Sequence, residues 1–170
     1  MGRHFGPAGW GVRRARLGYT SGVMTVKAGW STPMLRVAEV ERSIRFYRLL
    51  GFDLIDVEGD DGCPLGWARM ATADGSAVMF LRDEEWHVVE PELQGIMLVL
   101  YTAELPSLRE QLLAAGEKPT PIERPPWMPS GHIMLRDPDG HTIGINHWGD
   151  TEHEAWLKQL EEKRREGIIP

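Results

Sequence analysis

The chain has 170 residues, 42% hydrophobic and 26% charged, which is typical of one globular domain. Its single cysteine, Cys63, rules out an intrachain disulfide framework and a cysteine-based zinc site, and it suits a cytoplasmic location. No run of about 18 consecutive apolar residues is present, so we expect no membrane-spanning helix and no membrane partner.

Charge is distributed unevenly along the chain. Residues 1–29 hold five basic residues and no acid, so the rest carries a net charge of −11 within a total of −6. An acidic body is a poor partner for nucleic acid. We predict that residues 1–29 form a disordered, basic N-terminal extension, with Met24 as an alternative native start. A targeting peptide is the other interpretation of this Arg-rich segment.

The next region, residues 30–85, is predicted to run strand, helix and then three strands. Apolar residues at Val40, Ile44, Tyr47 and Leu50 have the spacing of a helix, and Gly51 is placed to end it. The expected strands cover residues 33–37, 52–57, 65–70 and 77–81, and the last two form a hairpin.

Residues 94–148 repeat this order. We expect a strand over 96–101, a helix from Leu105 that ends at Gly116, a short strand over 118–122, and strands over 132–135 and 142–147. A two-copy repeat indicates a fused pair of βαβββ units, an α+β fold whose sheets curl into a cup. Small ligands prefer such concave surfaces.

A charged helix is predicted over residues 151–167. Thr151 and Glu154 fit a capping box, and Trp156 and Leu160 form an apolar pair one turn apart. The simplest interpretation is a helix with a solvated face, and a partner-binding helix is the alternative.

Two stretches carry a resemblance to a known family. Residues 34–52 contain Ser-Ile-x-Phe-Tyr followed by Leu-Gly-Phe, and residues 137–143 read Asp-Pro-Asp-Gly-His-Thr-Ile. They resemble the opening unit and the penultimate hairpin of the vicinal oxygen chelate superfamily, which includes glyoxalases, bleomycin-resistance proteins and extradiol dioxygenases. The resemblance covers about residues 30–148 and implies two βαβββ modules, about 30–85 and 94–148, that form a cup-shaped mixed sheet.

In that superfamily a divalent metal is usually held by His, Glu or Gln side chains from four strands. The resemblance places these positions at Thr32, Phe80, Gly95 and Gly144. None is a normal catalytic metal ligand, and two have no side chain. We therefore expect no metal and no cofactor, as in the bleomycin-resistance proteins, which sequester a drug as dimers.

Seven residues are candidates for ligand binding because we expect them to face the cup or border its mouth: Arg36, Trp67, Phe80, Met97, Trp127, His132 and Asn146. The resemblance to glyoxalase I gives Arg36 the place of an arginine that contacts a substrate carboxylate, and a salt bridge with an acid such as Glu58 is the alternative. Core packing of Trp67 also stays open.

Two candidates have a more specific interpretation. Trp127 lies in a proline-rich loop with little core around it, which favours a ligand contact. His132 is the one candidate for a catalytic role, because histidine can act as a general base near neutral pH. A structural, hydrogen-bonded His132 is the alternative.

The sequence therefore predicts a metal-independent, homodimeric protein that binds an amphipathic or aromatic small molecule in its cup. A metal-dependent lyase, isomerase or dioxygenase of the same superfamily is the alternative function. A metal-free enzyme that uses His132 or a carboxylate as general base is a third. The acidic body favours a cationic ligand, whereas Arg36 favours an anionic one, and the sequence leaves this conflict open.

Overall fold

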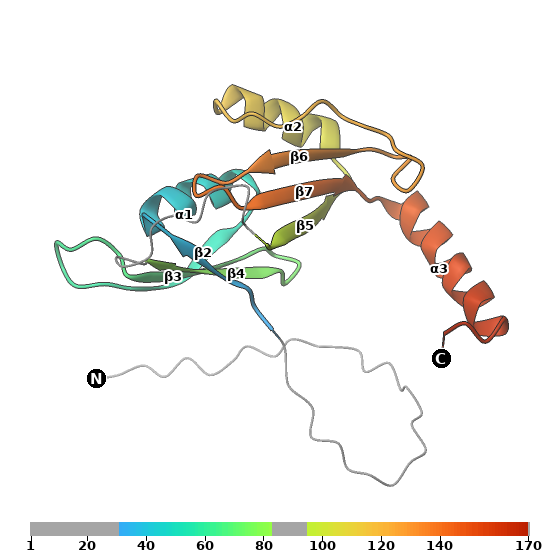
Figure 1. Cartoon of the computed structure of the whole chain (residues 1–170), viewed down its shortest axis with the longest axis horizontal. Helices are drawn as coiled ribbons and strands as arrows, with labels where there is room; N and C mark the ends of the chain where they lie inside the picture. Colours follow the sequence, from blue (N-terminus) through green and yellow to red (C-terminus); the bar gives the residue numbers. More distant parts are fainter. Residues whose placement is uncertain (1–30, 83–94, 170) are drawn as a thin grey trace, which may run out of the picture. The chain divides into compact units, whose positions relative to one another are not determined.

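The computed structural model describes residues 31–82 and 95–169, and the basic segment 1–29 lies outside these ranges. The order of elements confirms two successive units followed by a C-terminal helix (Figure 1). In chain order the elements are β1 (Met34–Val37), α1 (Val40–Leu49), β2 (Asp53–Glu58), β3 (Trp67–Ala71), β4 (Ala77–Arg82), β5 (Met97–Thr102), α2 (Leu105–Ala114), β6 (His132–Arg136), β7 (Thr142–His147) and α3 (Asp150–Arg165).

The first unit folds into a four-stranded mixed sheet, sheet A, with the strand order β1-β4-β3-β2. β1 runs parallel to β4, whereas the β3–β4 and β2–β3 pairs are antiparallel. Val40, Ile44 and Tyr47 recur at helical spacing, so α1 buries one apolar stripe against this sheet. Gly51 has a φ of 83° and ends the α1 segment as predicted, because glycine adopts this conformation without strain.

The second unit forms a three-stranded sheet, sheet B, with the order β5-β7-β6. β5 runs parallel to β7, and β6 runs antiparallel to it. α2 lies along one side of this sheet (Figure 1), and its Leu112 is buried in the same core as Ile133 and Ile145. Exposed and less exposed residues alternate along β5, so sheet B has a helix-facing side and a second side, whereas the middle of β7 is buried on both.

The short strand predicted over residues 118–122 is wrong. None of these five residues, all of which the structure describes, lies in a strand, and the isolated bridge that follows them joins Glu123 to His132. Pro119 and Pro121 lack the backbone N–H that a ladder needs. Thr120 between them instead bonds one residue twice: its N–H donates to the Met134 carbonyl (2.8 Å) and its hydroxyl oxygen accepts the Met134 N–H (2.9 Å).

The turn over residues 137–140 ties the second unit to α1 of the first. The Asp139 carboxylate accepts a hydrogen bond from Arg42 Nη2 (2.8 Å), and the Asp137 carboxylate accepts one from the Tyr47 hydroxyl (3.3 Å). Both carboxylates are buried, so these bonds form inside the protein rather than at its surface. Charge-assisted bonds of this kind hold the two units in one register.

α3 begins at Asp150, and its first turn is capped differently from the prediction. The N–H of Gly149 donates to Glu152 Oε2 (2.9 Å), so the expected box of Thr151 and Glu154 is wrong. None of the 16 residues of α3, which all lie in the described part, is buried. Within the described ranges, no helix combines the length and the apolar character that crossing a bilayer requires.

Candidate ligand-binding site

Sheet B has one face that α2 does not cover, named here the open face of sheet B. Side chains alternate along a strand, so every second residue of β5, β6 and β7 points to this face. The pairing register assigns to it Met97, Val99 and Tyr101 of β5, His132, Met134 and Arg136 of β6, and Thr142, Gly144 and Asn146 of β7. The face therefore carries several exposed apolar side chains around a few polar ones.

His132 and Asn146 are neighbours across β6 and β7 on the open face. They are only 7% and 8% exposed. Within the described residues, neither side chain takes part in a hydrogen bond, and neither has a polar atom that is sealed off from solvent. Buried polar groups in proteins are normally hydrogen-bonded. An unpartnered pair on an apolar face is therefore a place where a ligand can supply the missing partners.

The proline-rich loop places Trp127 directly against His132. The two ring centroids are 4.8 Å apart and the planes meet at 61°, an edge-to-face contact. Trp127 is 66% exposed, so its other surface is available for a ligand. The Met128 N–H donates to the Pro125 carbonyl (2.9 Å), a tight turn that holds the loop in place.

A carboxylate lies on the other side of the histidine ring. Glu123 bridges to His132 through the backbone, and its Oε2 is 3.7 Å from His132 Nε2. This distance is too long for a hydrogen bond but short enough for electrostatic attraction if the ring is protonated. Glu123 therefore gives this end of the open face a negative charge.

Four of the seven predicted ligand residues lie on or beside the open face: Trp127, His132 and Asn146 at one end of it, and Met97 opposite Thr142 toward the other end. Sequence reasoning missed two neighbours. One is Tyr101, which is 60% exposed and paired in register with Asn146. The sequence could have indicated it, because it lies four residues after Met97 and so points to the same face of the strand. Nothing in the sequence indicates Glu123, because its position depends on one isolated bridge.

Arg36 and Trp67 lie instead on sheet A. Both are paired in register with Leu81, so they share the face of sheet A that points away from α1. Glu58, the alternative partner of Arg36, lies on β2, and β4 and β3 separate that strand from β1. The anion-binding candidate and the unpartnered polar pair therefore belong to different sheets.

The expected orientation of Phe80 is wrong. Its side chain is fully buried against Tyr47 of α1, with ring centroids 4.8 Å apart. A shift of one residue turns a strand side chain to the opposite face. Met79 is the neighbour of Phe80 that faces away from α1, in register with Met34.

The positions that would carry metal ligands do not fit a divalent ion. The Thr32 hydroxyl is buried without a partner and supplies at most one neutral oxygen, and Gly95 supplies no side chain. A Cβ at Gly144 would lie 3.3 Å from the Met134 sulfur, so a thioether covers that position. Among the described residues, no three His, Cys, Asp or Glu side chains gather closely enough to hold a metal. Hard divalent cations need several oxygen or nitrogen donors in fixed geometry.

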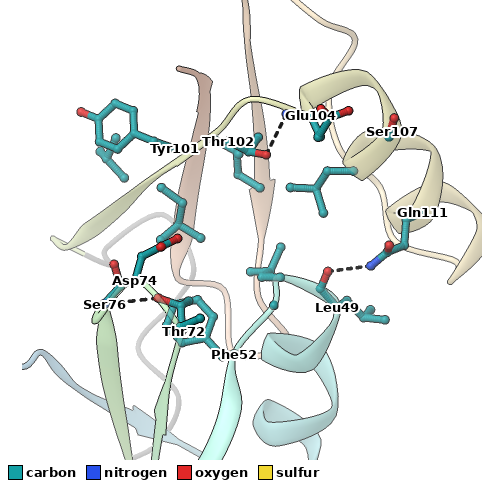
Figure 2. Close-up of a pocket in the computed structure, with 17 residues that line it drawn as sticks. Leu49, Phe52, Thr72, Asp74, Ser76, Tyr101, Thr102, Glu104, Ser107 and Gln111 are labelled. Atoms are coloured by element: carbon teal, nitrogen blue, oxygen red, sulfur yellow. Dashed lines mark hydrogen bonds between the residues drawn. The ribbon is translucent and has the colours of Figure 1, made fainter. Parts of the chain in front are cut away.

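A groove of about 610 Å³ lies where the end of α1 and the β3–β4 turn meet β5 and α2 (Figure 2). Tyr101 borders both this groove and the open face. Gln111 closes one side, because its amide donates to the Leu49 carbonyl (2.9 Å). Of the described residues that line it, the only charged ones are Asp74 and Glu104, and none is a histidine or cysteine. The groove offers surface for a ligand and two carboxylates, but no histidine to activate one of its hydroxyls.

A family model for the Glyoxalase/Bleomycin resistance protein/Dioxygenase superfamily matches residues 29–145. The chain belongs to this superfamily. The match confirms the resemblance that the two sequence stretches carry, and it covers both units of the fold.

Several solved structures share this fold. A domain from Frankia sp. EAN1pec aligns with a TM-score of 0.61 and 19% identity over 75% of this chain and 97% of its own. A bleomycin-binding protein complexed with bleomycin aligns with a TM-score of 0.55 and 19% identity over 72% and 100%. TnmS3, an antibiotic-binding protein from Streptomyces sp. CB03234, aligns with a TM-score of 0.53 and 21% identity over 73% and 100%. No curated protein matches the chain. At these identities the likeness shows the fold alone.

Proposed function

We propose that this member of the glyoxalase superfamily is a metal-independent protein that binds an amphipathic or aromatic small molecule on the open face of sheet B. One observation carries the proposal: His132 and Asn146 are buried, and within the described residues neither side chain makes a hydrogen bond, beside an exposed tryptophan, Trp127. Ligand sites combine a largely apolar surface with a few convergent polar groups, and this face has both. The bleomycin-binding protein and TnmS3 support it, because proteins of the same fold bind antibiotics.

The apolar part of the face also supports binding. Met97, Val99 and Tyr101 are all exposed side chains on the same side of β5. Contiguous exposed apolar surface on a folded protein commonly marks an interaction site. A flat aromatic ligand would cover these side chains and stack on Trp127 at the same time.

The binding role is tested by a thermal-shift screen of planar amphipathic compounds, because a ligand that binds the folded state raises the melting temperature. The hits are then titrated against Trp127→Ala, with Ile55→Ala as a control at an exposed apolar residue of β2, on the other sheet. We expect about tenfold weaker binding for Trp127→Ala and unchanged binding for the control. Equal affinities for both variants would overturn this location of the site.

Metal independence is supported by the donor chemistry at the four superfamily positions. We expect purified protein to contain no stoichiometric metal and to keep its ligand affinity after treatment with a chelator. Stoichiometric iron, manganese, nickel or zinc, together with binding or turnover that a chelator abolishes, would favour a metal-dependent lyase, isomerase or dioxygenase instead.

A second candidate function is metal-free general base catalysis. The observation that favours it is the 3.7 Å approach of Glu123 to the His132 ring, since a carboxylate commonly orients a catalytic histidine. This role predicts that His132→Ala abolishes turnover of a bound compound while leaving its affinity within a few-fold. Turnover that survives in His132→Ala would exclude it.

We also propose that the chain forms a homodimer through α3. The helix exposes Trp156 and Leu157 near its middle, has acids in its first turn, and has Lys163, Arg164 and Arg165 in its last turn. Two copies packed antiparallel would cover the apolar residues and place each acidic end beside a basic one. Light scattering is expected to give twice 19.2 kDa for the native chain and a shift toward monomer for Leu157→Glu.

A cytoplasmic location is part of the proposal, with Cys63 as its support. This residue is exposed and unpaired, which suits a reducing compartment.

A further inference from the structure

The side chain of Asn146 makes a specific demand on a ligand. A carboxamide presents one acceptor, the oxygen, and a donor NH2 group, side by side and in one plane. Both lack partners in the described structure, and both lie on a residue that is only 8% exposed. This holds whichever way the amide is turned, because either orientation presents the same pair of groups.

We propose that the open face of sheet B selects planar heteroaromatic ligands with a lactam-type edge, in which an N–H donor stands beside a C=O acceptor. That edge pairs with the Asn146 amide through two parallel hydrogen bonds, while the ring system lies against Trp127. The inference rests on the proposed binding function and specifies its ligand class. Asparagine recognises the donor–acceptor edge of adenine by the same two-bond geometry.

Other ligand chemistries leave part of the site unsatisfied. A carboxylate would accept from the amide NH2 but leave the amide oxygen unpaired, and it would meet the negative charge of Glu123 beside His132. An ammonium group would pair with the oxygen but leave the NH2 unpaired. A buried polar group that remains unpaired on binding reduces affinity substantially. An edge that carries both a donor and an acceptor satisfies both groups.

The surface next to Asn146 suits a flat ring. Gly144 lies two residues before it on the same strand face and presents no side chain. The sulfur atoms of Met134 and Met97 lie 3.3 and 3.8 Å from the place where a Cβ at Gly144 would be. Thioethers are polarisable and adapt to aromatic surfaces. A ring paired with Asn146 can therefore extend over these two methionines.

The test compares two compounds that differ by one methyl group. 2-Quinolone has the lactam edge, whereas N-methyl-2-quinolone has the same ring without the N–H donor. Both are titrated against the full chain by NMR or tryptophan fluorescence. We expect 2-quinolone to bind at least about tenfold more tightly. Equal affinities, or binding of neither compound, would overturn the lactam inference, whereas the binding function itself stands or falls with the thermal-shift screen and the Trp127→Ala variant.

Two variants at Asn146 make the test more specific. Asn146→Leu keeps the size of the side chain but removes both polar groups, so the two quinolones should bind it equally. Asn146→Asp presents two acceptors and should instead prefer the 2-aminoquinolinium cation, whose edge carries two donors. A preference for 2-quinolone that persists in both variants would overturn the assignment to Asn146.

Discussion

Two regions of the molecule bury polar side chains and treat them in opposite ways. The buried polar residues of the described part are Ser43, Asp137, Asp139 and His141 at the junction of the two units, and His132 and Asn146 on the open face of sheet B. At the junction every one of them is hydrogen-bonded. On the open face neither side chain is.

The two carboxylates of the junction are satisfied within it, whereas Nε of Arg42 beside them is buried without a hydrogen bond. Asp137 accepts hydrogen bonds from the Tyr47 hydroxyl, from the Asp139 N–H, and from both the backbone and the ring of His141, at 2.8–3.3 Å. Asp139 accepts bonds from α1, including the 2.8 Å bond from Arg42. Satisfied networks of this kind rigidify a fold.

The contrast shows that burial of a polar group has two meanings. Where all its bonds are made, the group specifies structure. Where they are missing and the polar atoms still reach solvent, as at His132 and Asn146, the group is available to bond a ligand. Each prediction below tests whether the junction and the open face differ in this way.

The largest expected effect is at the junction, for Asp137→Ala. The substitution leaves four donors without an acceptor inside the protein, so we expect the free energy of unfolding to fall by about 3–5 kcal/mol. Urea denaturation measures this loss. Asp74→Ala, at an exposed turn aspartate, is the control and should change it by less than about 0.5 kcal/mol. Similar losses for both variants would remove the basis for calling the junction structural.

The second-largest expected effect is a fall in the free energy of unfolding at alkaline pH, which Tyr47 causes. Burial and the adjacent Asp137 raise the pKa of this hydroxyl above its ordinary value of 10.0. Unfolded tyrosine ionises at that value and the folded form does not, so the stabilisation is complete below pH 10.0 and is lost as the pH rises above it. The loss is about 1.4 kcal/mol per pH unit. Tyr47→Phe should lack this loss, and parallel stability–pH curves for the two proteins would contradict the prediction.

On the open face, removal of a buried polar side chain should not destabilise the protein, in contrast to Asp137→Ala at the junction. Asn146→Leu replaces an unpaired buried amide with an apolar group of similar size. We expect it to leave stability unchanged or raise it by up to about 1 kcal/mol, measured by urea denaturation. A loss comparable to that of Asp137→Ala would place Asn146 among the structural residues.

The smallest effect concerns the start of α3. Hydrogen bonds from the Ser130 hydroxyl and the Gly149 N–H lower the pKa of Glu152 below its ordinary value of 4.5. The carboxylate therefore stabilises the helix start above pH 4.5, and the contribution disappears as the pH falls through the lowered value. Hydrogen exchange of the first α3 turn should rise at acid pH in the native chain. In Glu152→Gln, which keeps an acceptor but cannot titrate, this pH dependence should be absent.

Local physics made much of the fold predictable. The helix that ends at Gly51, the repeat of that pattern up to Gly116, and the Asp-Pro-Asp-Gly turn all depend on residues that are adjacent in sequence. The lack of a strong metal ligand at Thr32 and Gly144 was also predictable, because it follows from the residue types themselves.

Errors arose where a residue's environment depends on another segment. The side of the sheet that Phe80 occupies depends on the register of β4 against β1, and a shift of one position reverses it. The strand expected over 118–122 does not form, because the prolines on either side of Thr120 cannot donate backbone hydrogen bonds. Thr120 alone bonds to Met134, once through its backbone and once through its hydroxyl. The sequence did not indicate Glu123, because its position beside His132 depends on one isolated bridge between two segments.

The sequence by itself determined the superfamily and most of the order of the elements, because local patterns and residue types encode them. Only the tertiary structure decided that His132 and Asn146 lie side by side, that Trp127 contacts the His132 ring, and that neither side chain is hydrogen-bonded within the described residues. Such facts depend on strand pairing and loop closure between residues far apart in the chain, where small shifts exchange one face for the other.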